Sequence, residues 1–280
     1  MTSTQDALSG SRFEFGANWM RFLAVVDDRR IAEAESSLKH MLGVEGLTDQ
    51  TFLDIGSGSG LFSLAARRLG ATVHSFDYDP QSVACTQELK RRYFPEDDEW
   101  RIERGSVLDR DYLESLGQFD IVYSWGVLHH TGAMWLALEN AIGRVRFSGG
   151  KLFIALYNDQ GWKSHAWWLV KGIYNRLPRF LQAPFVAGMM LITHIVVILK
   201  YTLKRQPMTA IESIRGVRYE RGMSTKYDQI DWIGGFPYEF VSFDTVTSYL
   251  AARGFAVINS RRNTTLGCSE WVVERMACAE

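Results

Sequence analysis

The chain has 280 residues, a hydrophobic fraction of 46% and a formal net charge of −1, so it can fold as one large domain with an insertion, and no overall charge would attract nucleic acid. Its three cysteines, Cys85, Cys268 and Cys278, are far apart without a CxxC spacing, so we expect neither a disulfide framework nor a bound metal. The N-terminus lacks a basic segment followed by an apolar one, so we expect no signal peptide and a cytoplasmic location.

Strand and helix signals alternate from Thr51 onward. Short apolar runs predict strands over residues 51–55, 71–76, 100–103, 119–124 and 151–157. Pro80 suits the first turn of a helix that reaches Tyr93, and Thr131 is expected to cap a helix through Val145. After a long interruption, Ser242 is expected to cap another helix before strands over 255–260 and 269–275. This alternation predicts an α/β fold with a mostly parallel, doubly wound sheet.

A glycine-rich turn follows the first predicted strand. Residues 53–60 read Leu-Asp-Ile-Gly-Ser-Gly-Ser-Gly, and a helical pattern leaves this turn. Glycine lets a ligand approach bare backbone, and the start of a helix offers free N–H groups. A dinucleotide-binding turn needs GxGxxG, but the place of its third glycine is taken by Leu61. The pattern is DxGxGxG instead, which argues against a dehydrogenase.

This segment resembles motif I of class I S-adenosylmethionine-dependent methyltransferases, and the resemblance covers about residues 52–156. It implies S-adenosylmethionine as cofactor and a Rossmann-like sheet of seven strands whose last strand is antiparallel, with a helical insertion after strand five. The implied parts are an N-terminal helical lid (1–50), a cofactor-binding core (51–157), an acceptor-pocket insertion (158–240), and a closing helix with strands (241–280). The glycine turn would lie beneath the methionine part of the cofactor through Asp54, Gly56, Ser57, Gly58 and Gly60.

Further cofactor contacts are expected at the ends of the next strands. Asp77 ends the second strand, where an acid can accept hydrogen bonds from two ribose hydroxyls, although Asp77 and Asp79 could instead only cap the helix at Pro80. The family position that follows the glycine after strand three is an acid, but here it is Ser106. The remaining contacts implied by the resemblance are Tyr78, Ser106, Val107, Trp125, Gly126 and, from the lid, Trp19, which could equally belong to a flap packed on the core.

Two histidines follow the fourth strand, where a methyl acceptor would lie. A hydroxyl acceptor needs a base, and the pKa of histidine lies close to neutral. His129 or His130 could serve, without a distinction between them, or both could only pack beneath the loop. Candidates for acceptor binding are Tyr157, Asn158, Trp162 and His165, and residues 263–268 could also line the pocket. Tyr157 and Asn158 could instead only cap their loop.

The insertion is rich in aromatic residues and contains an apolar run from Ala183 to Leu199, with basic residues on both sides. Such a segment can be buried as a lid, pair with a second copy, lie on a membrane surface or, at the short limit of length, span a membrane. We therefore expect residues 183–204 to contact a membrane surface or a homodimer partner, if they are not core.

The expected function is methyl transfer to a small molecule. The chain lacks the Asn/Asp-Pro-Pro-aromatic motif of enzymes that methylate exocyclic nitrogens of nucleobases, and its Leu-His-His segment resembles O-methyltransferases of the ubiquinone-biosynthesis type. The apolar insertion favours a hydroxyl of an apolar or amphipathic acceptor. The alternatives are N-, S- or C-methylation of a small molecule or a lipid-linked glycan, and a non-catalytic scaffold that binds S-adenosylmethionine.

Overall fold

The computed structural model describes residues 15–24, 26–206, 208–209, 211 and 232–276. Its centre is a seven-stranded sheet in the order β3-β2-β1-β4-β5-β7-β6. The strands are β1 (Thr51–Ile55), β2 (Thr72–Asp77), β3 (Trp100–Arg104), β4 (Ile121–Trp125), β5 (Lys151–Tyr157), β6 (Phe255–Arg261) and β7 (Cys268–Arg275). The first five strands are parallel, and β7 lies antiparallel between β5 and β6. The predicted α/β fold with an antiparallel last strand is therefore confirmed.

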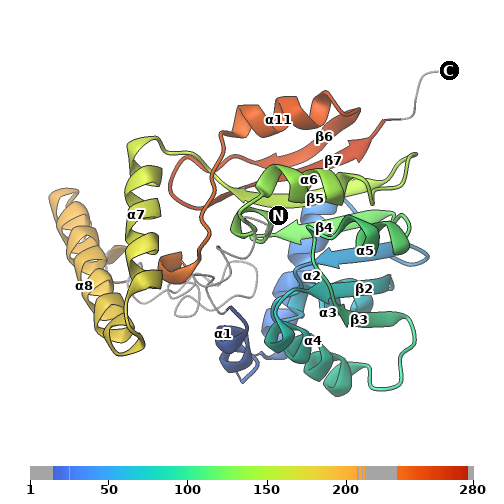
Figure 1. Cartoon of the computed structure of the whole chain (residues 1–280), viewed down its shortest axis with the longest axis horizontal. Helices are drawn as coiled ribbons and strands as arrows, with labels where there is room; N and C mark the ends of the chain where they lie inside the picture. Colours follow the sequence, from blue (N-terminus) through green and yellow to red (C-terminus); the bar gives the residue numbers. More distant parts are fainter. Residues whose placement is uncertain (1–14, 25, 207, 210, 212–231, 277–280) are drawn as a thin grey trace, which may run out of the picture.

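Helices cover both faces of the sheet (Figure 1). One group packs in a hydrophobic cluster on one face, and consists of α2 (Asp28–Leu42), α3 (Leu61–Arg68) and α4 (Pro80–Tyr93). The other group packs in a second cluster, and consists of α5 (Arg110–Ser115), α6 (Met134–Ile142) and α11 (Phe243–Ala251). Two separate clusters of buried apolar side chains on a sheet of parallel strands are the packing that a doubly wound fold requires.

Side-chain caps explain where several helices begin. The carboxylate of Asp79 accepts a hydrogen bond from the backbone N–H of Gln81 (2.8 Å), with Pro80 in the first turn. The predicted cap Ser242 accepts a hydrogen bond from the N–H of Thr245 (3.1 Å). The expectation for Thr131 was wrong: its hydroxyl donates to the carbonyl oxygen of Leu128 (2.7 Å) and closes a short 3-10 turn, η2 (Leu128–His130), so the helix begins only at α6.

The strand order places a crevice between β1 and β4. Strand β1 pairs with β2 on one side and with β4 on the other, so consecutive connections leave the sheet in opposite directions at this point. The loops that follow β1, β2 and β4 all leave from the carboxyl edge of the sheet. In open α/β sheets this edge, at the reversal of strand order, is where ligands bind.

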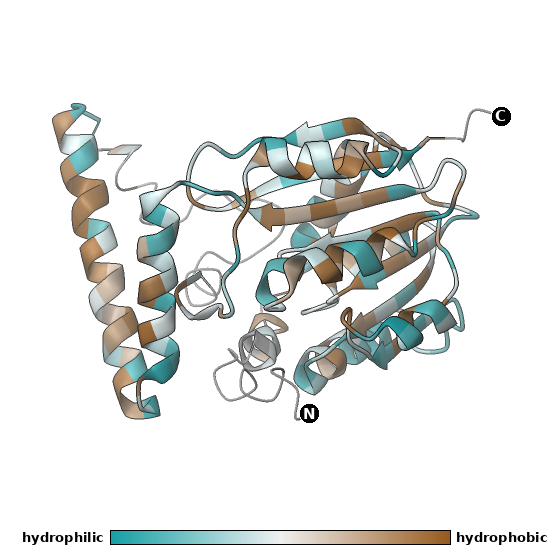
Figure 2. Ribbon diagram, turned by 45° about the horizontal axis from the view of Figure 1, so that its top comes forward, coloured by the Kyte–Doolittle hydropathy of each residue, from teal (hydrophilic) through white to brown (hydrophobic). Residues whose placement is uncertain are grey.

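The insertion contains a helical hairpin that lies beside the sheet domain (Figures 1 and 2). It consists of α7 (Trp162–Arg176) and α8 (Arg179–Leu203), with the rings of Tyr174 and Phe185 6.0 Å apart between them. Helix α8 has no buried residue, which excludes the core of this chain as its environment. By length and composition alone it could cross a membrane, with a mean hydropathy of 1.9 over its most apolar window.

Candidate active site

The glycine turn after β1 adopts the backbone conformation for which the sequence selects glycine. Gly56, Gly58 and Gly60 all have positive φ values, of 78°, 56° and 80°. A Cβ atom on Gly56 would also lie 2.5 Å from the Cγ1 atom of Val127, so no larger residue fits there. Gly56, Ser57 and Gly58 line the cavity at the carboxyl edge of the sheet, whereas Gly60 packs against Thr86 and does not line it.

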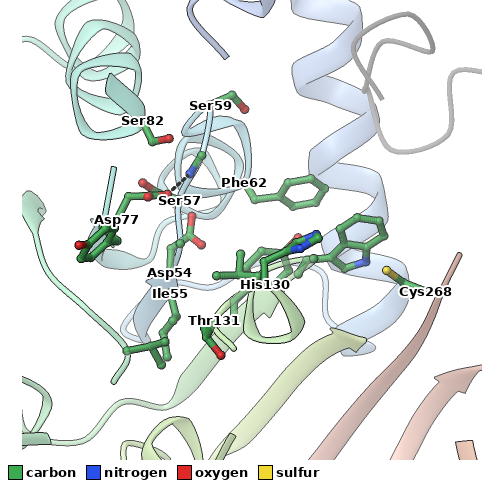
Figure 3. A pocket seen from close by; sticks show the side chains of 18 of the residues that line it. Asp54, Ile55, Ser57, Ser59, Phe62, Asp77, Ser82, His130, Thr131 and Cys268 are labelled. Carbon is green, nitrogen blue, oxygen red and sulfur yellow. Dashed lines mark hydrogen bonds between the residues drawn. The ribbon is translucent and has the colours of Figure 1, made fainter. Parts of the chain in front are cut away.

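The cavity has a volume of about 970 Å³ and joins the turns after β1, β2, β3 and β4. Figure 3 shows Asp77 on one side of this cavity and His130 and Cys268 on the other. The other predicted cofactor contacts that line it are Asp54, Tyr78, Ser106, Val107, Trp125, Gly126 and Trp19. The structure therefore brings all the predicted cofactor contacts except Gly60 to one space.

Asp77 connects the second strand to the glycine turn. Its Oδ2 atom accepts a hydrogen bond from the N–H of Gly58 (2.9 Å), and its Oδ1 atom accepts one from the N–H of Asp79 (2.9 Å). A carboxylate has about four acceptor positions in all, and Asp77 lines the cavity. Asp79 caps α4, as predicted, and also accepts a hydrogen bond from the N–H of Gly16 (2.8 Å).

That second bond holds helix α1 (Phe15–Phe22) at the rim of the cavity. Trp19 on this helix lines the cavity, and its ring lies 3.1 Å from the place that a Cβ atom on Gly58 would occupy. The described part of the N-terminal segment thus lies directly over the glycine turn, where a lid would be. Residues 1–14 of the predicted lid lie outside the described residues.

Asp54 is a buried carboxyl group with few partners of its own. Its Oδ2 atom accepts a hydrogen bond from the hydroxyl of Ser63, which in turn accepts one from the hydroxyl of Ser75 (2.8 Å). Burial raises the pKa of Asp54 to about 7; the bond from Ser63 lowers it, and the nearby charge of Asp77 raises it. Because Asp54 also lines the cavity, a positively charged group bound there would find a buried carboxyl ready to ionise.

The two histidines occupy different environments, which the sequence pattern did not distinguish. His129 is fully buried, does not line the cavity, and stacks on Tyr157 with ring centroids 3.9 Å apart. Its Nδ1 atom accepts a hydrogen bond from the N–H of Tyr157 (3.3 Å). Burial lowers the pKa of His129 well below 6.5, and the nearby His130 and Lys171 lower it further. These contacts make His129 a neutral packing residue, so its nomination as a base is not supported by its position.

His130 lines the cavity. Its Nδ1 atom lies 2.6 Å from the carbonyl oxygen of Pro237, an acceptor without a hydrogen, so Nδ1 carries the proton. In that tautomer Nε2 is the nitrogen that can accept a proton. His130 therefore has the form that a general base requires.

The predicted acceptor contacts are separated by the structure. Tyr157 lines the cavity, but Asn158, Trp162 and His165 do not. Asn158 donates from Nδ2 to the carbonyl oxygen of Asn263 (2.8 Å) and so joins two loops, while Trp162 is 75% exposed and His165 lies in a separate shallow pocket. Trp162 and His165 lie in the first turn of α7, whereas the contacts of α7 with the cavity residues Tyr157 and Trp232 come from farther along the helix.

Other residues form the acceptor side of the cavity. The loop between β6 and β7 lines the cavity, as expected for residues 263–268. Among the described residues of the insertion, Trp232 also lines it. Glu270 was missed: it is buried, lines the cavity and accepts a hydrogen bond from Nε1 of Trp125 (3.1 Å). A signal was present, because Glu270 is an acid directly before three apolar residues, Trp271, Val272 and Val273.

Comparison with known proteins identifies the type of domain. Residues 53–152 match a family described as a methyltransferase domain. The chain is 36% identical over 77 residues to a ribosomal protein L11 methyltransferase of Prochlorococcus marinus, which covers 27% of this chain and 26% of that protein. It is 30% identical over 144 residues to a ubiquinone biosynthesis O-methyltransferase of Parvibaculum lavamentivorans, which covers 49% of this chain and 52% of that protein. The chain thus spans between a quarter and about half of the length of these relatives.

A solved structure has the same fold. Magnesium protoporphyrin IX methyltransferase from Synechocystis PCC 6803 with bound SAH aligns with a TM-score of 0.52 and 12% identity, over 88% of this chain and 83% of that chain. At this level of identity the likeness shows a shared fold.

Proposed function

We infer that this class I S-adenosylmethionine-dependent methyltransferase transfers a methyl group to a hydroxyl oxygen of an apolar or amphipathic small molecule. The observation that carries this proposal is the state of His130, whose Nδ1 atom is held by the carbonyl of Pro237 while the ring lines the cavity. A hydroxyl acceptor must lose its proton as the oxygen attacks the methyl carbon, and His130 is the base in the cavity wall that can take this proton.

The residues of the cavity fit the cofactor. Asp54 offers a buried carboxyl whose pKa is raised by burial, and the ammonium group on the methionine part of the cofactor would favour its charged form. Asp77 offers acceptor positions for the ribose hydroxyls. Val107 and Ile55 supply apolar surface for the adenine. The hydroxyl oxygen of Ser106 accepts a hydrogen bond from the backbone N–H of Leu108 (3.2 Å).

The cofactor supplies the activated methyl carbon, and the chain supplies alignment and the removal of a proton. Trp19 covers the glycine turn, so that water has less access to the reacting groups. Tyr157 and Trp232 give the acceptor side an aromatic wall. An aromatic or isoprenoid acceptor would bury its apolar surface against this wall and present its hydroxyl to His130.

A second candidate reaction is methylation of an amine. The buried carboxylate of Glu270 in the same wall favours it, because a carboxylate can hold a protonated amine in place and take its proton, which frees the lone pair that attacks the methyl carbon. Glu270 is also compatible with a hydroxyl acceptor, since a carboxylate can accept its hydrogen bond. The two candidates therefore differ in the acceptor atom and in the residue that receives its proton.

The test is a screen with S-adenosylmethionine that carries a ¹³C-labelled methyl group. Phenols, hydroxylated quinones, isoprenoid alcohols and apolar amines would be offered in parallel, and the chemical shift of the product methyl would identify the acceptor atom. An O-methyl signal that disappears in His130→Ala is expected. An N-, S- or C-methyl product would contradict O-methylation, and tight binding of S-adenosylhomocysteine without turnover on any acceptor would favour the scaffold alternative.

A further inference from the structure

We propose that the hairpin of α7 and α8 docks this protein on an anionic membrane surface, with α8 lying along the interface between lipid and water. The proposal goes beyond the methyl transfer reaction and does not depend on it. It rests on the exposed apolar surface of α8, on the charge of the hairpin and on the way in which α7 is attached to the sheet domain.

Helix α8 exposes apolar side chains along its whole length. The largest exposed fractions are those of Phe180 (76%), Leu191 (61%), Leu199 (58%) and Leu203 (85%). Large contiguous apolar patches on a protein surface mark contacts with another protein or with a membrane. Figure 2 shows the apolar residues of α8 in brown, on the helix of the hairpin that lies farther from the sheet.

The charge of the hairpin selects an anionic partner. The sequence from Gln160 to Ile211 contains no aspartate or glutamate, and it contains seven basic residues: Lys163, Lys171, Arg176, Arg179, Lys200, Lys204 and Arg205. Arg176 and Arg179 lie at the turn between the helices, and Lys200, Lys204 and Arg205 lie at the opposite end of α8. An apolar helix with basic residues at both ends matches an interface of acyl chains and anionic headgroups.

The same charges disfavour a second copy of this chain as the partner. If two hairpins paired through α8 in antiparallel fashion, Lys200 and Lys204 of one copy would lie beside Arg176 and Arg179 of the other. A parallel pair would place each basic end beside its own equivalent. In both arrangements like charges meet, and residues 160–211 contain no aspartate or glutamate.

The attachment of α7 favours a helix that lies on the membrane over one that crosses it. Asn175 donates from Nδ2 to the carbonyl oxygen of Gly234 (2.8 Å), and Lys171 donates from Nζ to the carbonyl oxygen of Trp232. Because α8 packs along α7, a crossing α8 would have to carry the turn with Arg176 and Arg179 through the hydrocarbon. Charged residues at that depth are costly.

The hairpin is also in contact with the acceptor side of the cavity. The rings of Trp167 on α7 and Trp232 lie 5.4 Å apart, and Trp232 lines the cavity. Helix α7 would therefore connect a membrane surface beneath α8 to the wall that we assign to the acceptor. This arrangement suits an amphipathic acceptor that is dissolved in the bilayer.

The experiment is flotation of the full chain with vesicles of phosphatidylcholine alone and of phosphatidylcholine mixed with phosphatidylglycerol. The wild type is expected to float with the mixed vesicles and to be released by high salt. Replacing Lys200, Lys204 and Arg205 with Gln is expected to weaken binding on the order of a hundredfold. The triple variant Leu191→Glu, Ile195→Glu and Leu199→Glu, on one face of α8, is expected to remain unbound.

A matched control places the same three acids on exposed apolar positions of the sheet domain, as Leu136→Glu, Phe147→Glu and Val257→Glu. This control is expected to float like the wild type, and retained binding of S-adenosylhomocysteine would show that each variant is folded. A wild type that does not bind mixed vesicles would overturn the proposal. So would a lipid-free dimer that the α8 variant dissociates, or a vesicle-bound protein that resists extraction with alkaline carbonate.

Discussion

Replacement of Asp77 by alanine should weaken the binding of S-adenosylhomocysteine, because we propose that this carboxylate acts on the cofactor in two ways. It would accept hydrogen bonds from the ribose, and it holds the glycine turn through the N–H of Gly58. Alanine keeps the end of β2 but offers no acceptor to the turn or to the ligand.

The size of the effect follows from these contacts. A hydrogen bond to a charged group contributes about 1.5–3 kcal/mol. The loss of two ribose bonds, partly compensated by water, gives on the order of 3 kcal/mol, which corresponds to about a hundredfold in the dissociation constant. The least effect that we expect is tenfold, or about 1.4 kcal/mol.

The assay is calorimetric titration with S-adenosylhomocysteine, with Asp109→Ala as the matched control. Asp109 caps α5 through the N–H of Tyr112 (3.0 Å) on the same edge of the sheet but does not line the cavity. Its loss should cost about 1 kcal/mol of stability and leave the affinity unchanged. Affinity of Asp77→Ala within twofold of the wild type, in a folded protein, would refute the assignment of Asp77 to the ribose.

Three further changes test other parts of the site. His130→Ala should lower the turnover number at least a hundredfold while the affinity for S-adenosylhomocysteine stays nearly intact. The control His129→Phe, which preserves the buried ring, should retain turnover. Full activity of His130→Ala would exclude the role of His130 as base. Because the pKa of Asp54 is raised from 3.8 to about 7 by folding, the folded state binds its proton more tightly, and the stabilisation is present below pH 4 and is lost as the pH rises to about 7. The free energy of unfolding of Asp54→Asn relative to the wild type should therefore rise by about 3 kcal/mol between pH 5 and pH 8 in urea titrations without ligand, and a constant difference would contradict the buried environment. Trp19→Ala should weaken binding of S-adenosylhomocysteine severalfold, whereas Met20→Ala, at an exposed position of the same helix, should not; equal affinities would mean that α1 is not a lid.

The sequence predicted the sheet and the cofactor side of the site because both depend on local patterns. A glycine turn after a strand requires positive φ at three residues, and an acid at the next strand end lies beside it in any parallel sheet. These constraints act within a few residues, so Asp54, Gly56 and Asp77 could be placed by reading along the chain.

The acceptor side could not be predicted to the same extent, because it is assembled by contacts between distant segments. His129 and His130 are adjacent in sequence, and contacts with distant segments distinguish them: His129 packs on Tyr157, and the carbonyl of Pro237 holds the ring of His130. Glu270 reaches the cavity because β7 lies beside β5, which places its residue next to Ala155. Trp162 and His165 lie outside the cavity although they follow β5 closely in the sequence, and no local pattern reports where the first turn of α7 lies.

The measurement that tests the central claim most directly is calorimetric titration of the full chain with S-adenosylhomocysteine, beside an identical titration with NADH. We predict micromolar binding of S-adenosylhomocysteine and no binding of NADH, because the turn from Gly56 to Gly60 has the DxGxGxG pattern and its Asp77 partner. Binding of NADH instead, or of neither ligand, would contradict the assignment of this cavity to S-adenosylmethionine.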